Sequence, residues 1–340
     1  MGSHRRTAPS SGSDRSATVA LGLLSAAATA LAAVPAAATP HDVTRAEVDR
    51  LYREAEKATE AYNEADERAD GLRRQIATAQ DGIARQQARV NTMRESLGSL
   101  AGAQYRSGGL DPALALLLSD DPEDYLEKAS VLDRITVHQA AELRRLRGAL
   151  RSLAQDRAEA AGKLGALEKS RKAVAAHKRT VERKLTEARR LLASLPAGER
   201  AAWDRATRSA RADLLGPSGP SGAPASARAA AAVAAARSAL GRPYVWGAEG
   251  PSAFDCSGLT QWSYAQAGVA LPRTSQAQRY AGRRIPLSEA RPGDLVVYRS
   301  DASHVGMYMG NGQVIHAPHP GAPVRYDPVG MMPVSSVTRV

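Results

Sequence analysis

The sequence has few aromatic residues and only one thiol. A single phenylalanine and a single cysteine, Cys256, occur among its 340 residues, and aromatic residues make up only 4%. One cysteine excludes an intramolecular disulfide and leaves a thiol whose chemistry has to be explained. The scarcity of aromatic side chains argues against stacking platforms for bases, and the sequence contains no nucleic-acid-binding motif.

Acidic residues are also in the minority. Lysine and arginine number 46 against 35 for aspartate and glutamate, which gives a formal net charge of +11. Such a surplus favours anionic partners such as phospholipid surfaces or wall polymers, although a solvated charged surface accounts for most of it. Because the sequence has no nucleic-acid-binding motif and few aromatic residues, we nevertheless expect no nucleic acid among the partners of this chain.

Only one long stretch of the chain is apolar, and it lies near the N-terminus. Three arginines precede the apolar residues 17–34, and the small residues 36–38 follow them. This order is typical of a secretory signal peptide that is cleaved after Ala38. The alternative is an uncleaved membrane anchor, but the apolar run is shorter than the ~20 residues that a span needs. We assign residues 1–38 to a signal peptide and expect a secreted, extracytoplasmic protein.

Residues 39–213 are charged, rich in alanine and almost free of proline. Apolar side chains recur there at alternating intervals of three and four, a heptad pattern that predicts coiled-coil helices. One apolar seam runs from Val48 to Leu100. The second seam runs from Leu143 to Leu192, with Leu164 and Leu185 among its members.

Glycines and prolines interrupt the heptads between the two seams, around the apolar residues 113–118. Two long helices joined by a compact tip predict an antiparallel hairpin, while a parallel dimer is the alternative, and the oligomeric state stays open. The hairpin is either a spacer or an arm, and the sequence favours neither. As an arm it would cover another part of the chain or dock on a membrane complex.

A linker rich in glycine, proline, serine and alanine occupies residues 214–228. The sequence pattern changes after the linker, because short strand patterns and glycine turns occupy residues 229–340. A block of this length is sufficient for one compact domain.

Cys256 opens a predicted helix in this last block, with Asp255 as its N-cap. In the first turn the helix dipole favours the thiolate, and a lowered thiol pKa makes cysteine a nucleophile. A buried structural cysteine is the alternative.

A thiolate needs a base, and two histidines flank a predicted hairpin turn. A three-residue loop at 310–312, which pairs Met309 with Gln313, would place His304 and His316 diagonally on one face. A two-residue loop would place them on opposite faces. We expect the first arrangement, with one histidine as the base and the other orienting it.

A metal site is the rival use of these side chains. Cys256, His304, His316 and His319 offer four ligands, but no paired cysteine or histidine spacing typical of zinc is present. We expect no metal and no organic cofactor. His319 lies between prolines and is interpreted as a surface residue.

Six segments of the last block resemble the NlpC/P60 peptidases and occur in that family's order. They are GRPYVWG at 241–247, FDCSGL at 254–259, LPRTS at 271–275, RPGDLV at 291–296, SHVGMYMG at 303–310 and IHAP at 315–318. Ala248 stands where the family often has a second glycine. The resemblance implies an α+β, papain-like NlpC/P60 catalytic domain at 229–340, preceded by a long all-α antiparallel coiled coil.

The resemblance also implies roles for individual residues. Cys256 matches the nucleophile, His304 the base and His316 the orienting third residue. Tyr244 resembles the family tyrosine near the oxyanion. The residues that resemble those shaping the pocket for the peptide stem are Asp255 and Ser257.

The substrate that the resemblance implies is the peptide stem of peptidoglycan, commonly cut between D-γ-glutamyl and a diamino acid. An amidase or acyltransferase with the same three residues is one alternative. An adaptor protein with an inert peptidase domain is another. The order of signal, coiled coil, linker and NlpC/P60 domain resembles secreted wall hydrolases whose coiled coil is held by a membrane complex or covers the active site.

Overall fold

The structure is a computed structural model that describes residues 40–106, 122–201 and 222–340. The predicted signal peptide, the apolar run at 113–118 and residues 214–221 of the predicted linker lie outside these ranges. No helix in the described part of the chain has both the length and the apolar character that a membrane span requires.

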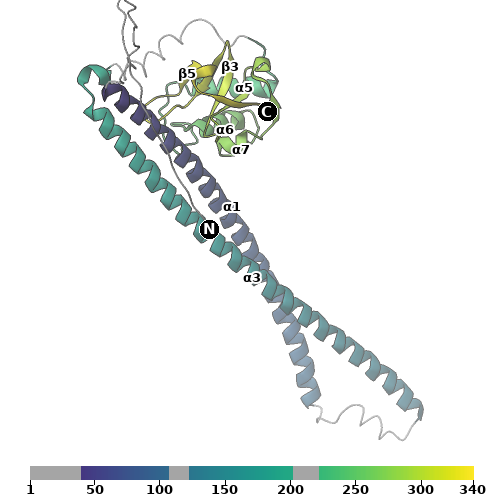
Figure 1. Cartoon of the computed structure of the whole chain (residues 1–340). Helices are drawn as coiled ribbons and strands as arrows, with labels where there is room; N and C mark the ends of the chain where they lie inside the picture. The colour runs from purple at the N-terminus through teal and green to yellow at the C-terminus, as the bar shows by residue number, and fades with distance from the viewer. Residues whose placement is uncertain (1–39, 107–121, 202–221) are drawn as a thin grey trace, which may run out of the picture. The chain divides into compact units, whose positions relative to one another are not determined.

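Two long helices, α1 (Pro40–Arg106) and α3 (Pro122–Ser194), form an antiparallel pair (Figure 1). Ala55 packs with Leu185, and the Ser170 hydroxyl donates to the carbonyl of Ala65 at 3.0 Å. Farther along, Arg157 donates to the side-chain oxygen of Gln87 at 2.7 Å. As the residue number increases along α1, the number of the contacting residue on α3 decreases. The two helices therefore run in opposite directions, and the predicted antiparallel hairpin is confirmed.

Parts of the predicted seams form the buried contact between the two helices. Its buried members on α1 and α3 include Val48, Leu51, Ala55, Ala69, Val90, Leu153, Val181, Leu185 and Ala188. Leu143 and Leu164 were also assigned to a seam, but they are 44% and 50% exposed. A strict seven-residue repeat drifts around a straight helix by about 20° per heptad, so it leaves the interface over a long helix.

A second face of α1 is buried and polar. Glu56, Thr59, Glu60 and Asn63 follow one another at intervals of three, one and three residues, and each is at most 6% exposed. Their contacts, described below, are made largely with the C-terminal domain. Nothing in their sequence spacing distinguishes this stripe from a solvated helix face.

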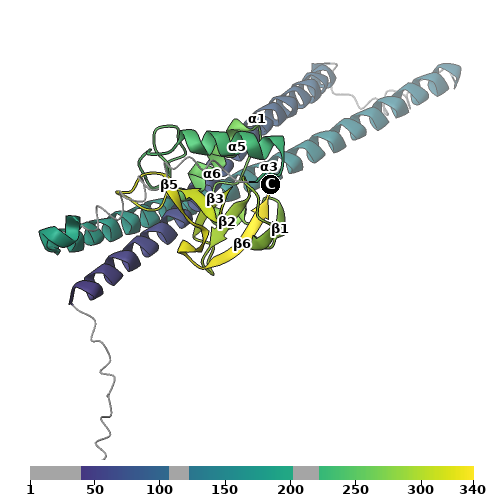
Figure 2. The same ribbon diagram turned by 90° about the horizontal axis from the view of Figure 1, so that it is seen from above.

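The C-terminal domain combines three helices with a six-stranded antiparallel sheet of order β1-β6-β2-β3-β4-β5 (Figure 2). The helices are α5 (Ala227–Ser238), α6 (Cys256–Gln266) and α7 (Ser275–Gln278). The strands are β1 (Arg283–Ile285), β2 (Leu295–Tyr298), β3 (His304–Gly310), β4 (Gln313–His316), β5 (Arg325–Pro328) and β6 (Val334–Arg339). Two 3₁₀ turns, η1 (Leu287–Glu289) and η2 (Val329–Met331), complete the domain.

Alternation along the strands creates two cores. The larger core joins Val233 of α5 and Leu259 of α6 to inward residues of β2 and β3 such as Met307. A smaller cluster on Val296 and Val337 covers the other face. The larger core fixes the start of α6 against the sheet, and this contact positions the thiol.

The β3–β4 hairpin differs from the predicted one. Its turn contains two residues, Asn311 and Gly312, both at positive φ (52° and 67°), which favours asparagine and glycine. Gly310, and not Met309, pairs with Gln313. The predicted three-residue loop is therefore wrong. A bulge in β3 nevertheless restores the predicted register beyond the turn, because it adds one residue to that strand.

Loss of a seam leucine should weaken the hairpin only where the side chain is buried. Leu185→Ala is expected to lower the free energy of unfolding of the helical hairpin by about 2–4 kcal/mol through a cavity. The matched Leu164→Ala change should cost less than about 1 kcal/mol. Urea unfolding followed by helical circular dichroism measures both values, and equal losses would contradict the assigned interface.

Candidate active site

Cys256 is the first residue of α6 and has no exposed surface. Asp255 caps the helix, and its carboxylate accepts the backbone N–H of Gly258 at 2.7 Å. A side chain at Gly258 would place Cβ 2.2 Å from the carbonyl oxygen of Ala248, so the close approach requires glycine. The capped first turn thus points the thiol toward the sheet.

The sheet brings both predicted catalytic histidines to this thiol. His304 begins β3, His316 ends β4, and Nε2 of the first lies 2.8 Å from Nδ1 of the second. A ring nitrogen of His304 lies within 4.8 Å of the Cys256 sulfur. Gly306 leaves room for the pair, since a Cβ there would lie 3.2 Å from Cβ of His316.

A fourth polar residue, Asp327 of β5, extends this row and was not identified from the sequence. Its Oδ2 lies 2.8 Å from Nε2 of His316 and accepts Nε of Arg325 at 2.9 Å. Burial lowers the pKa of His316 to about 4, in spite of the hydrogen bond with Asp327, so the ring is neutral. Burial opposes ionisation of Asp327, but His316 and Arg325 hold its pKa below the ordinary value.

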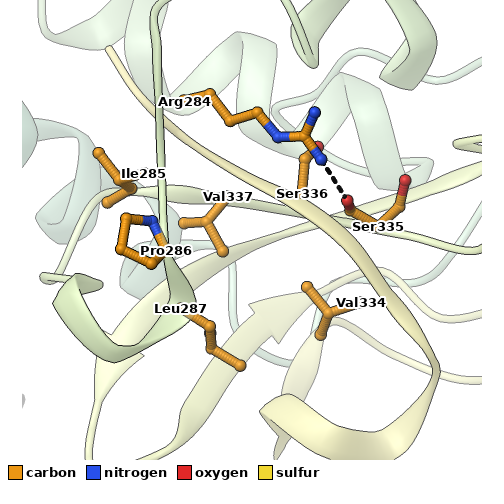
Figure 3. A pocket seen from close by; sticks show the side chains of 8 residues that line it. All are labelled: Arg284, Ile285, Pro286, Leu287, Val334, Ser335, Ser336 and Val337. Atoms are coloured by element: carbon orange, nitrogen blue, oxygen red, sulfur yellow. Dashed lines mark hydrogen bonds between the residues drawn. The ribbon is translucent and has the colours of Figure 1, made fainter.

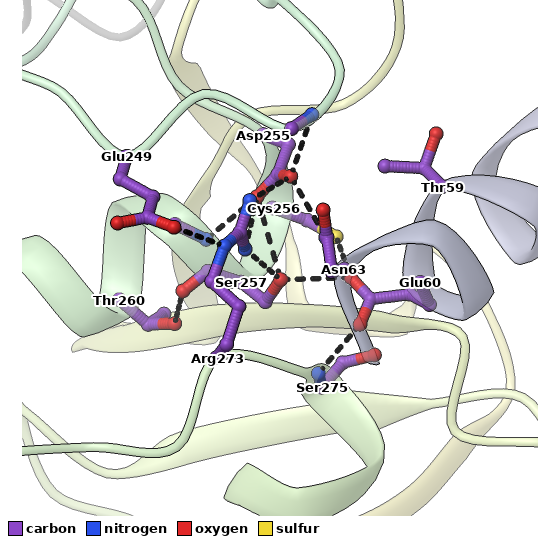
Figure 4. Close-up of polar contacts among 12 residues, drawn as sticks. Thr59, Glu60, Asn63, Glu249, Asp255, Cys256, Ser257, Thr260, Arg273 and Ser275 are labelled. Atoms are coloured by element: carbon purple, nitrogen blue, oxygen red, sulfur yellow. Dashed lines mark hydrogen bonds and ion pairs between the residues drawn. The ribbon is translucent and has the colours of Figure 1, made fainter. Parts of the chain in front are cut away.

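Asp255 and Ser257, predicted to shape a substrate pocket, are joined by a buried arginine for which the sequence predicted no role (Figure 4). Arg273 donates to the Asp255 carboxylate at 2.6 and 3.1 Å and to the Ser257 hydroxyl at 2.9 Å. The backbone of Gly247 and the side chain of Asn63 also donate to this carboxylate, at 3.0 and 3.1 Å. The carboxylate is thereby fixed by three residues besides the helix N-terminus.

Tyr244 is buried in the core cluster that contains Cys256. Burial, with the nearby thiol, raises its pKa well above the ordinary value and keeps the phenol neutral. A neutral hydroxyl retains a proton to donate, as the role implied for Tyr244 requires.

A carboxylate from α1 lies beside the thiol, as Figure 4 shows. Glu60 accepts the Ser257 hydroxyl and the backbone N–H of Ser275, each at 2.8 Å, and its Oε1 lies 3.5 Å from Sγ of Cys256. The residue is 2% exposed. Glu60 therefore occupies space in front of the thiol.

A second carboxylate, one helical turn earlier, reaches the histidine. Glu56 contacts Nδ1 of His304 and accepts Nη1 of Arg299 at 2.6 Å. Burial opposes ionisation of Glu56, but His304 and Arg299 hold its pKa below the ordinary value. The nitrogen of His304 that does not face His316 is thus occupied by α1.

Aromatic contacts extend the interface of α1 with the domain. Tyr52 stacks on His319 with ring centroids 4.6 Å apart, and Tyr62 meets Trp246 edge-on at 5.1 Å. The interpretation of His319 as a surface residue is wrong, because its ring is half-buried against α1. The site is closed by side chains some 200 residues away in the sequence.

The closed arrangement also alters the electrostatics of the thiol. Burial raises the pKa of Cys256 well above its ordinary value, and the charges of Glu60 and Glu56 add to the shift. The lowered thiol pKa predicted from the helix dipole is therefore wrong for this arrangement, since burial, together with nearby carboxylates, outweighs the partial charge of the helix end. Burial and the charge of Asp255 raise the pKa of Glu60 to about 7.

One group of potential metal ligands exists among the described residues, and it differs from the four considered in the sequence. Glu56, Cys256 and His304 place one ligand atom each within 4.8 Å of one another. His316 faces Asp327 and His319 faces Tyr52 instead. Each of the three grouped side chains has a hydrogen-bonding partner within the protein.

A cavity of about 460 Å³ lies elsewhere, at the β1 edge of the sheet (Figure 3). Arg284 spans it and donates to the carbonyl of Ser335 at 3.0 Å. Its other lining residues are Ile285, Pro286, Leu287, Val334, Ser336 and Val337. The lining contains serine hydroxyls but no thiol, carboxylate or imidazole, so the cavity lacks a general base that would activate a nucleophile.

A cysteine that opens a helix, packed on an antiparallel sheet that presents histidines, defines a papain-like α+β domain of the cysteine peptidase type. Residues 241–337 match the sequence model described as the NlpC/P60 family. This part of the chain is an NlpC/P60 family domain, as the sequence motifs predicted.

Named relatives match the same region. A probable endopeptidase of Corynebacterium glutamicum is 49% identical over 104 residues, which cover 31% of this chain and 50% of the relative. The probable endopeptidase p60 of Listeria monocytogenes is 53% identical over 94 residues, 27% of this chain and 19% of the relative. This chain thus spans half or less of the length of these relatives.

Among solved structures, the NlpC/p60 domain of the peptidoglycan hydrolase SagA matches with 39% sequence identity and a TM-score of 0.32. The match covers 33% of this chain and 98% of that one.

The pKa of Glu60 predicts a pH-dependent exposure of the thiol. Its pKa rises from 4.5 to about 7 in the docked helix, so docking is favoured below pH 4.5 and weakens as pH rises toward 7. Between pH 5 and 7, alkylation of Cys256 should therefore rise more steeply in the unaltered chain than in Glu60→Gln, by up to about tenfold per pH unit. Parallel pH profiles of the two chains would refute this linkage.

Proposed function

We propose that this protein is a secreted peptidoglycan endopeptidase that cuts peptide stems, between D-γ-glutamyl and a diamino acid. One observation carries the proposal: Cys256, His304 and His316 meet inside a domain of the NlpC/P60 family. Matched relatives bear the name probable endopeptidase, which supports the reaction class. The bond and the substrate are those that the family resemblance implies.

The reaction proceeds through a thioester. His304 takes the proton of Cys256, and the thiolate attacks the carbonyl carbon of the stem amide. His304 then returns the proton to the leaving amine as the C–N bond breaks, which leaves the acyl group on sulfur. Water, deprotonated by the same histidine, hydrolyses the thioester and restores the thiol. Backbone N–H groups at the start of α6, together with Tyr244, stabilise the oxyanion.

The described arrangement is a closed state of this enzyme. Glu56 occupies the nitrogen of His304 that the reaction uses, and Glu60 fills the space in front of Cys256. A substrate carbonyl has to reach a thiol that has no exposed surface. Cleavage therefore requires α1 to move away from the domain.

A partner that acts on the hairpin would supply this movement. Polar contacts of α1 with the domain, such as Glu56 to Arg299 and Asn63 to Asp255, are reversible when both sides regain water. A membrane complex outside the cytoplasm is the partner that the domain order favours. In that role the hairpin is a regulatory arm and not a spacer.

An amidase or an acyltransferase would use the same three residues on a different bond or with a different acceptor. Mass spectrometry of the fragments released from purified peptidoglycan separates these reactions, because each leaves different new ends. An adaptor with an inert domain would release no fragments under any condition.

Loss of the nucleophile tests the reaction itself. In a chain released by Glu56→Ala and Glu60→Ala, the further change Cys256→Ser should lower wall cleavage by at least about 10³-fold without lowering the melting temperature. His304→Ala should be nearly as damaging and His316→Ala less so, because a base transfers protons whereas an orienting residue holds the ring.

His138, which is exposed on α3, supplies the matched control His138→Ala, which should leave cleavage unchanged. Undiminished cleavage by Cys256→Ser would overturn the mechanism, and loss of cleavage with chelators would favour a metal site.

Removal of the two carboxylates tests the closed state. The pair of changes Glu56→Ala and Glu60→Ala should raise both wall cleavage and alkylation of Cys256 by at least about tenfold, since hydrogen bonds to charged groups contribute about 1.5–3 kcal/mol each. The control pair Glu64→Ala and Glu67→Ala removes the same charge from exposed positions of α1. If both pairs behave alike, α1 does not restrain the enzyme.

A further inference from the structure

Three polar side chains on neighbouring strands form a continuous row behind the thiol. His304 contacts His316 at 2.8 Å, and His316 contacts Asp327 at 2.8 Å through its other ring nitrogen. The register of β4 and β5 produces this arrangement, because Val314 pairs with Asp327 and His316 pairs with Arg325. Residues two apart on a strand share a face, so Asp327 lies diagonally next to His316.

The hydrogen bonds of this row determine which ring nitrogens of His304 and His316 carry protons. Nε of Arg325 donates to Oδ2 of Asp327 at 2.9 Å, and Nη2 of Arg325 forms an ion pair with the same oxygen at 2.8 Å. This oxygen also faces His316. An ionised carboxylate only accepts hydrogen bonds, so Nε2 of His316 has to carry a proton. The neutral His316 ring then presents a lone pair at Nδ1, and Nε2 of His304 has to donate to it.

Resting on the function proposed above, we propose that Asp327 is a positioning residue of the catalytic site. Its carboxylate fixes the tautomer of His316 and, through it, the tautomer of His304 in which Nδ1 is free to take the thiol proton. Asp327 touches neither the thiol nor the substrate and transfers no proton. Its charge also stabilises His304 once that ring carries the second proton.

The row explains how Glu56 blocks the base. Because Nε2 of His304 already donates to His316, a proton at Nδ1 that is shared with the Glu56 carboxylate fills the second nitrogen as well. The ring then has no lone pair for the thiol proton. The closed state and the positioning by Asp327 thus depend on the same proton arrangement.

A purely structural role for Asp327, as an ion pair with Arg325 that holds β5, is the alternative. Asp294 is the matched control, since it is also buried, directly precedes β2 of the same sheet and pairs with Arg339 at 2.9 and 2.7 Å. Its hydrogen bonds involve no histidine. Asp294→Ala and Asp327→Ala therefore both remove a buried ion pair, but only the second frees the histidine row.

The first measurement is the ring ¹⁵N spectrum of the seven histidines in the full chain, which reports tautomers without any need for activity. We expect the Nε2–H tautomer for His316, with a mixture of tautomers in Asp327→Ala. Asp327→Asn should keep the tautomer, because the donors of Arg325 hold its amide oxygen toward His316. Asp294→Ala should leave the ring signals unchanged. A single unchanged tautomer in Asp327→Ala overturns the proposal.

The second measurement uses the chain released by Glu56→Ala and Glu60→Ala. Asp327→Ala should lower kcat on a defined stem peptide, and the alkylation rate of Cys256, by about tenfold or more, with KM changed less than about twofold. Asp327→Glu should recover part of both rates. An equal loss in Asp294→Ala would make the role structural. If Cys256 of the released chain is alkylated but the chain cleaves no peptide, the proposed function fails. The ring ¹⁵N signals and the alkylation rates of Cys256 still decide the role of Asp327 in that case.

Discussion

The buried carboxylate of Asp255 is the interaction on which the site depends. It caps the helix that presents Cys256, binds the guanidinium of Arg273 and receives the amide of Asn63 from α1. An uncompensated charge at this depth would cost several kcal/mol, so its donors have to be in place together. The start of α6, Arg273 and α1 are therefore held by one carboxylate.

The docked helix adds two further buried carboxylates, and they are not equivalent. Glu56 lies between His304 and Arg299, which hold its pKa below the ordinary value, whereas burial and the charge of Asp255 raise the pKa of Glu60 to about 7. The Glu56 contact favours the closed site, whereas ionisation of Glu60 near neutral pH opposes it. A restraint with this balance is reversible, as the proposed regulatory arm requires.

The sequence predicted the fold class and the family because both rest on local patterns. Heptads specify long helices, and six short motifs specify the NlpC/P60 domain, which the family match confirms. The same patterns led to Cys256, His304 and His316, which the sheet brings together. Asp327 was missed because an aspartate in an edge strand resembles any solvent-facing residue until its cross-strand neighbour is known.

What the sequence alone determined is therefore the set of elements and the chemistry they carry: two long helices, one thiol at a helix start and two histidines beside a turn. The tertiary structure decided which groups face that chemistry. Glu56 and Glu60 look like ordinary charges on a helix, and only docking buries them against residues some 200 to 250 positions away. Burial and charge pairing over such separations arise from packing, which no local spacing encodes. For this reason the direction of the Cys256 pKa shift was set by the fold and not by the helix that carries the thiol.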